Sequence, residues 1–129
     1  MIISSFAAGR DEAFYCDTLE EGLSMLAVSH RAVLRLFQHP GTGEIRVPAT
    51  PKKLLNLVTH LAKTGQIQGM SVHTQKAMFE GRVVTGVRIK KFARTADEYI
   101  ITWPGGDLRI RFHQNAMRGL FYFYYSRGK

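Results

Sequence analysis

The chain has 129 residues, of which 45% are hydrophobic and 22% charged, and its formal net charge is +8 at pH 7. This composition excludes an intrinsically disordered chain, and the length predicts one domain with its own hydrophobic core. The single cysteine, Cys16, excludes an intrachain disulfide. With no apolar run long enough to cross a bilayer and no signal peptide, the chain is predicted to be cytoplasmic and without membrane contact.

Two short apolar segments open the chain and precede a predicted helix. Met1–Phe6 and Ala13–Cys16 have the composition of strands, separated by a polar turn. Thr18 is then a suitable N-cap, and Glu21, three residues later, completes a capping box. Gly22 costs this helix about 1 kcal/mol relative to alanine, so we expect tertiary packing to hold it. Its apolar face would consist of three leucines, Leu19, Leu23 and Leu26.

The next segment is predicted to repeat the order strand, strand, helix. Ala32–Gln38 alternates apolar and polar residues over part of its length, and a glycine-rich turn separates it from a returning strand at Glu44–Val47. A second helix is then predicted to begin with Thr50 as its cap and Pro51 at its first position. Gly65 is the predicted C-terminal stop of this helix.

The rest of the chain is rich in β-branched and aromatic residues and predicts mainly strands, although residues 73–80 also fit a helical turn. A hairpin is expected in which Trp103 pairs with Leu108, and a bulge is expected at Lys90 and Lys91. The predicted fold class is α+β, with an antiparallel sheet and two helices packed on one face, in an approximate ββα-ββα start followed by a β-meander. The predicted strands are Ile67–His73, Arg82–Phe92, Tyr99–Trp103, Leu108–Phe112 and Leu120–Tyr125.

Basic residues alternate with apolar residues on four of the predicted strands. Side chains along a strand point alternately to the two faces of a sheet, so the arginines and lysines would gather mostly on one face. Residues 30–129 contain 17 basic and five acidic residues, and such a charge attracts polyanions, of which nucleic acid is the commonest in a cell. The alternative is that the basic residues only keep the strands soluble. The four segments are Val33–Phe37, Ile45–Val47, Val87–Lys90 and Leu108–Phe112.

Aromatic residues occupy both faces of the last predicted strand. Phe121, Phe123 and Tyr125 alternate with Tyr122 and Tyr124. One set would enter the core, while the other would be presented to stack on the bases of a single strand. The alternative is a central strand that is buried on both faces, with its tyrosine hydroxyls at the rim.

Two lysines at the start of the second helix and the five histidines are the other candidates for a site. Lys52 and Lys53 lie in the first turn, where backbone N–H groups favour anions, although both side chains also fit a solvated position. The histidines do not have the spacing of a helical metal site, and one cysteine cannot form a structural zinc site. We therefore expect no metal and no cofactor.

A metal-independent ribonuclease site is a further alternative. His113 lies close in sequence to Arg111 and Arg118, and Tyr122 or Tyr124 would be within reach if their strands pair. The basic hairpin followed by an aromatic strand resembles the last part of RelE-type ribonuclease toxins, which implies cleavage of RNA. The first 65 residues follow a different pattern.

The sequence therefore predicts a small basic protein that binds nucleic acid (DNA or RNA) without catalysis, through a cationic face of its sheet. One alternative is a protein-binding effector or inhibitor from a mobile element, a phage or plasmid, that acts on an acidic surface of a host protein. The second alternative is the RelE-like ribonuclease. The predicted nucleic-acid-binding residues are Arg35, Arg46, Lys52, Lys53, Arg88, Lys90, Lys91, Arg109, Arg111, Arg118, Tyr122 and Tyr124.

Overall fold

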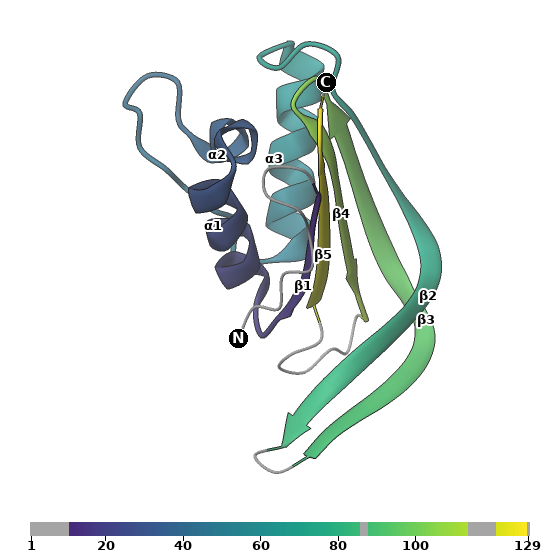
Figure 1. Cartoon of the computed structure of the whole chain (residues 1–129). Helices are drawn as coiled ribbons and strands as arrows, with labels where there is room; N and C mark the ends of the chain where they lie inside the picture. The colour runs from purple at the N-terminus through teal and green to yellow at the C-terminus, as the bar shows by residue number, and fades with distance from the viewer. Residues whose placement is uncertain (1–10, 86–87, 114–120, 129) are drawn as a thin grey trace.

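A five-stranded antiparallel sheet with three helices on one face forms the chain (Figure 1). The computed structural model describes residues 11–85, 88–113 and 121–128, with the backbone alone for residues 80–94. The strand order is β1-β5-β4-β3-β2, so the last strand lies inside the sheet beside the first. The elements are β1 (Asp11–Cys16), α1 (Leu19–Ser29), α2 (Arg31–Phe37), α3 (Pro51–Thr64), β2 (Ser71–Thr85), β3 (Arg88–Trp103), β4 (Gly106–Phe112) and β5 (Phe121–Arg127).

The predicted α+β class, the antiparallel sheet and the packing of helices on one face are confirmed. The predicted ββα-ββα start is wrong, because β1 is followed by three helices in succession. The predicted strand at Met1–Phe6 lies outside the described residues. Among the residues that the structure describes, no helix is both long and apolar enough to cross a membrane.

Helix α1 begins where its capping residues predict. The backbone N–H of Glu21 donates to Oγ1 of Thr18 at 3.1 Å, which satisfies one of the free donors of the first turn. The carboxylate of Glu21 does not complete the expected capping box with the Thr18 backbone in any described contact; it accepts a hydrogen bond from Sγ of Cys16 at 3.0 Å. Burial raises the pKa of the Cys16 thiol to about 11, with this hydrogen bond adding to the shift.

Gly22 of α1 is a packing requirement as well as a local weakness. A Cβ atom at this position would lie 2.2 Å from Cε1 of Phe123, whose side chain is fully buried on β5. Phe123 also stacks on Phe14 of β1, with 5.2 Å between ring centroids. The missing side chain therefore lets α1 approach the centre of the sheet, which compensates for the lower helix propensity of glycine.

The predicted strand at Ala32–Gln38 is helical and forms α2. Val33, Leu36 and Phe37 are buried on one side, at the i, i+3, i+4 spacing of a helix, and Arg35 is exposed. The apolar residues of so short a segment fit both the two-residue period of a strand and the 3.6-residue period of a helix. The segment is helical because a helix buries these three side chains against the core. Only an isolated bridge between Gln38 and Ile45 remains of the predicted hairpin, so Glu44–Val47 is not a strand.

Helix α3 has the predicted start and end. The backbone N–H of Lys53 donates to Oγ1 of Thr50 at 3.2 Å, and Pro51 occupies the first turn, where its missing N–H costs nothing. Gly65 ends the helix with a φ of 71°, a left-handed conformation that glycine adopts without strain. Leu54 and Val58 are fully buried, which places the apolar face of α3 on the sheet.

We expect Thr50→Ala to lower the free energy of unfolding by about 1 kcal/mol, because the variant leaves the Lys53 N–H without its partner in the first turn. Thr50→Ser, which keeps a hydroxyl acceptor, is the matched control and should stay within about 0.5 kcal/mol of the parent protein. Urea denaturation followed by circular dichroism measures both differences. Equal losses in the two variants would contradict a capping role for Thr50.

The hairpin between β3 and β4 has a tighter turn than expected. Ile101 pairs with Leu108 and Trp103 with Gly106, a shift of two residues from the predicted pairing of Trp103 with Leu108. Gly106 has a φ of 144°, and a Cβ there would lie 2.3 Å from the Ser126 carbonyl oxygen, so glycine is needed at this turn. A shift of two residues keeps each side chain on its face but changes its neighbours.

Strands β2 and β3 extend beyond the other strands as a two-stranded arm, which we define as residues 77–85 and 88–96. Strand β4 pairs with β3 only between residues 97 and 103, while β2 pairs with β3 from Ser71 to Thr85. Figure 1 shows the arm continuing past the end of β4 and bending. The predicted single strand at Arg82–Phe92 is therefore wrong, since this segment contains the end of β2 and the start of β3. The pairing is continuous at Lys90 and Lys91, so the predicted bulge is absent there.

Candidate nucleic-acid interface

The face of the sheet opposite the helices carries the chemically distinctive side chains; we call it the outer face. The strand register places its residues in rows that run across the strands. The row nearest the arm contains Tyr15, Tyr122, Arg111, Glu98 and Gln75. The next row contains Ala13, Tyr124, Arg109, Ile100 and His73. The row farthest from the arm contains Asp11, Ser126, Asp107, Thr102 and Ser71.

Charge is unevenly distributed over these rows. Arg111 and Glu98 offset each other in the row nearest the arm, Arg109 gives the middle row a positive charge, and Asp11 and Asp107 both lie in the farthest row. Asp107 accepts a hydrogen bond from Oγ1 of Thr102 at 2.6 Å, and Arg109 is exposed. A phosphate group would therefore be attracted to Arg109 and repelled by the farthest row, so the outer face favours an anion on the side toward the arm.

Glu98 holds Arg111 in place. Its side chain is 1% exposed, and its carboxylate accepts from Nε of Arg111 at 2.6 Å and from Nε2 of Gln75 at 2.7 Å. Burial alone would raise the pKa of Glu98, but the hydrogen bonds from Arg111 and Gln75, with the charges of Arg111 and Arg109, outweigh it and lower the pKa. The carboxylate is therefore ionised at neutral pH, and it fixes the guanidinium while 35% of the Arg111 side chain stays exposed.

The tyrosines of this face are half-buried and make contacts with each other and with charged groups. The Tyr15 and Tyr122 rings pack at 5.0 Å between centroids, and the Arg111 guanidinium carbon lies 5.6 Å from the centroid of Tyr122. The hydroxyl of Tyr124 donates to Oδ2 of Asp11 at 3.0 Å, and this hydrogen bond is the main reason that the pKa of Tyr124 is raised. Tyr122 and Tyr124 therefore lie on the face opposite Phe123 and Tyr125, in line with the alternation expected for β5.

A hollow of about 310 Å³ opens where the arm meets the outer face. Phe79 of β2, 1% exposed, packs there with Ala96, Tyr15 and Tyr122 in a small second hydrophobic cluster. The hollow is lined by residues from four strands, Tyr15, Met78, Phe79, Arg111 and Tyr122.

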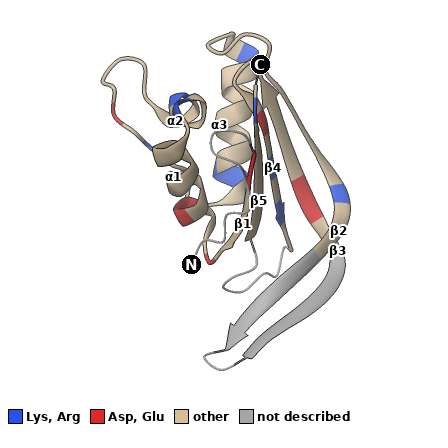
Figure 2. Cartoon of the chain, in the orientation of Figure 1, with Lys and Arg blue, Asp and Glu red and all other residues tan. Residues whose placement is uncertain are grey.

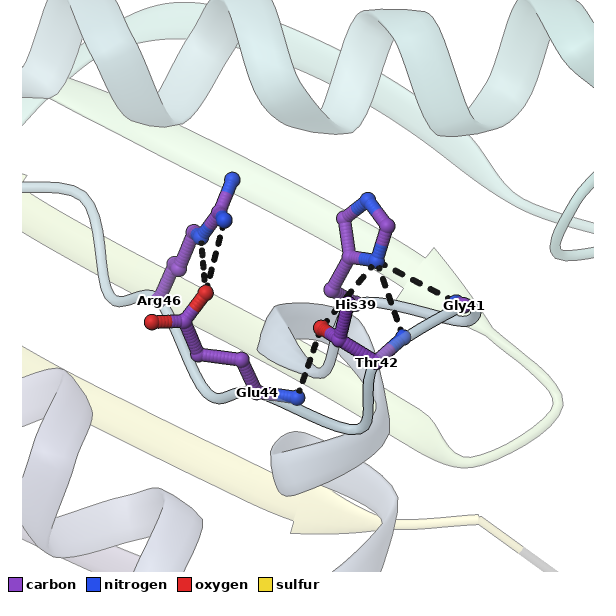
Figure 3. A network of polar contacts seen from close by, with 5 residues as sticks. All are labelled: His39, Gly41, Thr42, Glu44 and Arg46. Atoms are coloured by element: carbon purple, nitrogen blue, oxygen red, sulfur yellow. Dashed lines mark hydrogen bonds and ion pairs between the residues drawn. The ribbon is translucent and has the colours of Figure 1, made fainter.

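Two of the predicted site arginines lie in the helical layer, away from the outer face. Arg35 is an exposed residue of α2. Arg46 lies in the loop between α2 and α3, where Oε1 of Glu44 accepts from its Nε at 2.8 Å and lies 2.6 Å from its Nη2 (Figure 3). In the same loop, Nδ1 of His39 accepts from the backbone N–H groups of Gly41 and Thr42 (Figure 3). A single cationic plane that includes Arg35 and Arg46 is therefore wrong.

The remaining predicted basic residues divide into two groups. Lys52 and Lys53 are exposed in the first turn of α3, in the helical layer. Arg88, Lys90 and Lys91 belong to the arm, where the structure gives their backbone pairing in β3. The position of Arg118 lies outside the described residues. Figure 2 accordingly shows basic residues dispersed over α2, α3, β2 and β4, with acidic residues on α1 and β3.

The groups of the ribonuclease alternative are brought together only in part. Arg111 and Tyr122 are cross-strand partners, and His113 follows the last residue of β4. Tyr124 pairs with Arg109 in the adjacent row. Within residues 11–85, 88–113 and 121–128, no three side chains of His, Cys, Asp or Glu form a group that could hold a metal ion.

Four residues of this region were missed by the sequence prediction: Tyr15, Met78, Phe79 and Glu98. The alternation in Ala13–Cys16 predicts that Tyr15 faces away from Phe14, but only the pairing of β1 with β5 places it beside Tyr122. Glu98 was missed because the predicted hairpin register placed Ile100 opposite Arg111, a position that Glu98 occupies. Comparisons of the chain with models of known protein families, with curated proteins and with solved structures found no match.

Proposed function

We propose that the protein binds single-stranded nucleic acid on the part of the outer face that adjoins the arm. The observation that carries this proposal is the alternation of guanidinium and aromatic side chains across neighbouring strands, where Arg111 pairs with Tyr122 and Arg109 with Tyr124. Arginines contact phosphate oxygens, and tyrosine rings stack on bases, so adjacent pairs of this kind suit a strand whose bases are unpaired. A duplex keeps its base faces stacked on each other and offers nothing for these rings.

The composition of the arm supports a polyanionic partner. Residues 80–94 contain five basic residues, Arg82, Arg88, Lys90, Lys91 and Arg94, and one acidic residue, Glu80. The pairing of β2 with β3 places Arg82 directly opposite Lys91. A segment with this excess of basic residues attracts a phosphate backbone.

Affinity should fall steeply with salt. With about four phosphate contacts on a single strand, the slope of log K against log salt is about −3, which corresponds to a loss of about 50-fold between 50 and 200 mM NaCl. Fluorescence anisotropy with labelled 12-nucleotide DNA and RNA strands measures this slope. Absence of binding to both strands at 50 mM NaCl would rule out the proposed function.

A matched pair of variants locates the interface. We expect Arg109→Ala to weaken binding several-fold and to reduce the salt slope by about 1, because it removes one exposed guanidinium from the outer face. Arg35→Ala removes a guanidinium that is also exposed but belongs to α2, in the helical layer, and should leave affinity nearly unchanged. The same loss in both variants would indicate attraction to net charge alone, without a defined face.

A further inference from the structure

We infer that the hollow between the arm and the outer face is a pocket for one nucleobase, and that it prefers guanine to adenine. This inference rests on the proposed function and adds a specificity-determining site to it. The hollow differs from the rest of the outer face because a residue of the arm, Phe79, forms one of its walls.

The size and the walls of the hollow suit one planar ring. Its volume of about 310 Å³ lies at the lower end of the range for small-ligand pockets. Tyr15 and Tyr122 are half-buried and Phe79 is buried, so these aromatic side chains are held by packing. Met78 is 66% exposed, and a flexible thioether at the mouth can adjust to a ring that enters.

Hydrogen-bond chemistry selects among the bases. Among the residues whose side chains the structure describes, Arg111 is the one charged residue of the lining, and a guanidinium only donates hydrogen bonds. Glu98, the nearest acid by the strand register, is not part of the lining and its side chain is 1% exposed, so its carboxylate is not presented to the exocyclic amine of adenine. Guanine presents two acceptors, O6 and N7, on one edge, and this edge matches the arginine fork.

The phosphate next to the bound base has a partner on β4, the β-strand that also carries Arg111. Arg109 lies two residues before Arg111 on β4, on the same face, and is exposed. The two side chains are separated by about 6.6 Å along the strand, so one can reach the base while the other reaches the backbone. The pocket therefore sets the register of the bound strand on the protein.

Substitution of one base in a uniform strand tests the pocket without changing the protein. The probes are labelled 12-nucleotide strands of deoxyadenosine in which one central base is adenine, guanine, inosine, 7-deazaguanine or absent. We expect guanine and inosine, which share O6 and N7, to bind about tenfold more tightly than adenine. We expect 7-deazaguanine, which lacks N7, to lose most of that gain, and the abasic strand to bind no better than adenine.

Two variants assign the preference to named side chains. Arg111→Lys keeps the positive charge but removes the fork, so the guanine-to-adenine ratio should fall to about 1. Tyr124→Leu, outside the hollow, should weaken binding of both strands and leave the ratio unchanged. Thermal unfolding confirms that each variant is folded before its ratio is compared.

The outcomes separate the pocket from the proposed function. Equal affinity for all five strands, with binding that still falls with salt, overturns the pocket and leaves the proposed function in place. A preference for guanine that survives Arg111→Lys also overturns the assignment. No binding of any strand at 50 mM NaCl overturns both proposals.

Discussion

Replacing Arg111 with methionine is expected to lower the free energy of unfolding by about 3 kcal/mol at pH 7. The substitution leaves the carboxylate of Glu98, which is 1% exposed, without its charged partner. Removal of one partner of a buried ion pair costs about 3–5 kcal/mol, and we expect the lower end because Gln75 still donates to Glu98 and because Arg111 is itself 35% exposed. Urea denaturation at fixed ionic strength measures the loss.

The loss of unfolding free energy in Arg111→Met should depend on pH, because it depends on whether Glu98 is ionised. In the parent protein the pKa of Glu98 is lowered, so its contribution to stability is present above the unfolded-state pKa and is lost as the pH falls through the folded-state pKa. In Arg111→Met the effect of burial is no longer outweighed, so the pKa rises and the folded state gains stability on protonation. The difference between variant and parent should therefore shrink between pH 7 and pH 4.

Two controls make this prediction specific to the ion pair. Arg109→Met removes the exposed arginine two residues away and should change stability by less than about 0.5 kcal/mol. The double variant Arg111→Met with Glu98→Gln has no buried charge and should recover part of the loss at pH 7. A loss in Arg111→Met that is the same at pH 7 and pH 4 would show that packing, and not the charge of Glu98, is responsible.

The contact between Gly22 and Phe123 should give the second large effect. Phe123→Ala removes a fully buried ring and is expected to cost about 3–5 kcal/mol. Gly22→Ala should cost about 1–3 kcal/mol although alanine favours helix, because its Cβ would lie 2.2 Å from the ring. In the double variant the added methyl group occupies space that the ring has left, so the combined loss should be smaller than the sum of the two.

A double-mutant cycle by urea denaturation measures this coupling. Phe123→Leu replaces Phe123→Ala in the cycle if the alanine variant is not folded at 25 °C. Ser24→Ala, a substitution in the same helix at a partly exposed position, controls for helix propensity and should be neutral or slightly stabilising. Additive losses for Gly22→Ala and the Phe123 variant would mean that the two residues do not meet in the folded protein.

Helices α1 and α3 were predictable because their ends carry local chemistry. Thr18, Thr50, Pro51 and Gly65 act within one turn of their own position, and no distant residue is needed to interpret them. Helix α2 has no such signal, because His30 makes no side-chain hydrogen bond as its N-cap. Its seven residues are also too few for the spacing of apolar residues to distinguish a helix from a strand. Its helical state is decided by burial against the core, which the sequence pattern does not contain.

The alternation of side chains along each strand predicted only part of the candidate site. Alternation assigned Arg109 and Arg111 to one face of their strand and Tyr122 and Tyr124 to one face of theirs. It did not give the pairing of β4 with β5 that brings these faces together, nor the position of Glu98 opposite Arg111. Cross-strand neighbours depend on the register, and one tight turn at Gly106 changed the register by two residues.

The place of β5 inside the sheet has a consequence for how the chain reaches its folded state. Asp11 pairs with Ser126 and Cys16 with Phe121, so β1 finds its only described neighbour near the far end of the chain. Pairing across so long a separation closes a large loop and slows folding. A nascent chain on the ribosome cannot complete this sheet before residues 121–127 emerge, so we expect β1 to stay unpaired until β5 has been synthesised.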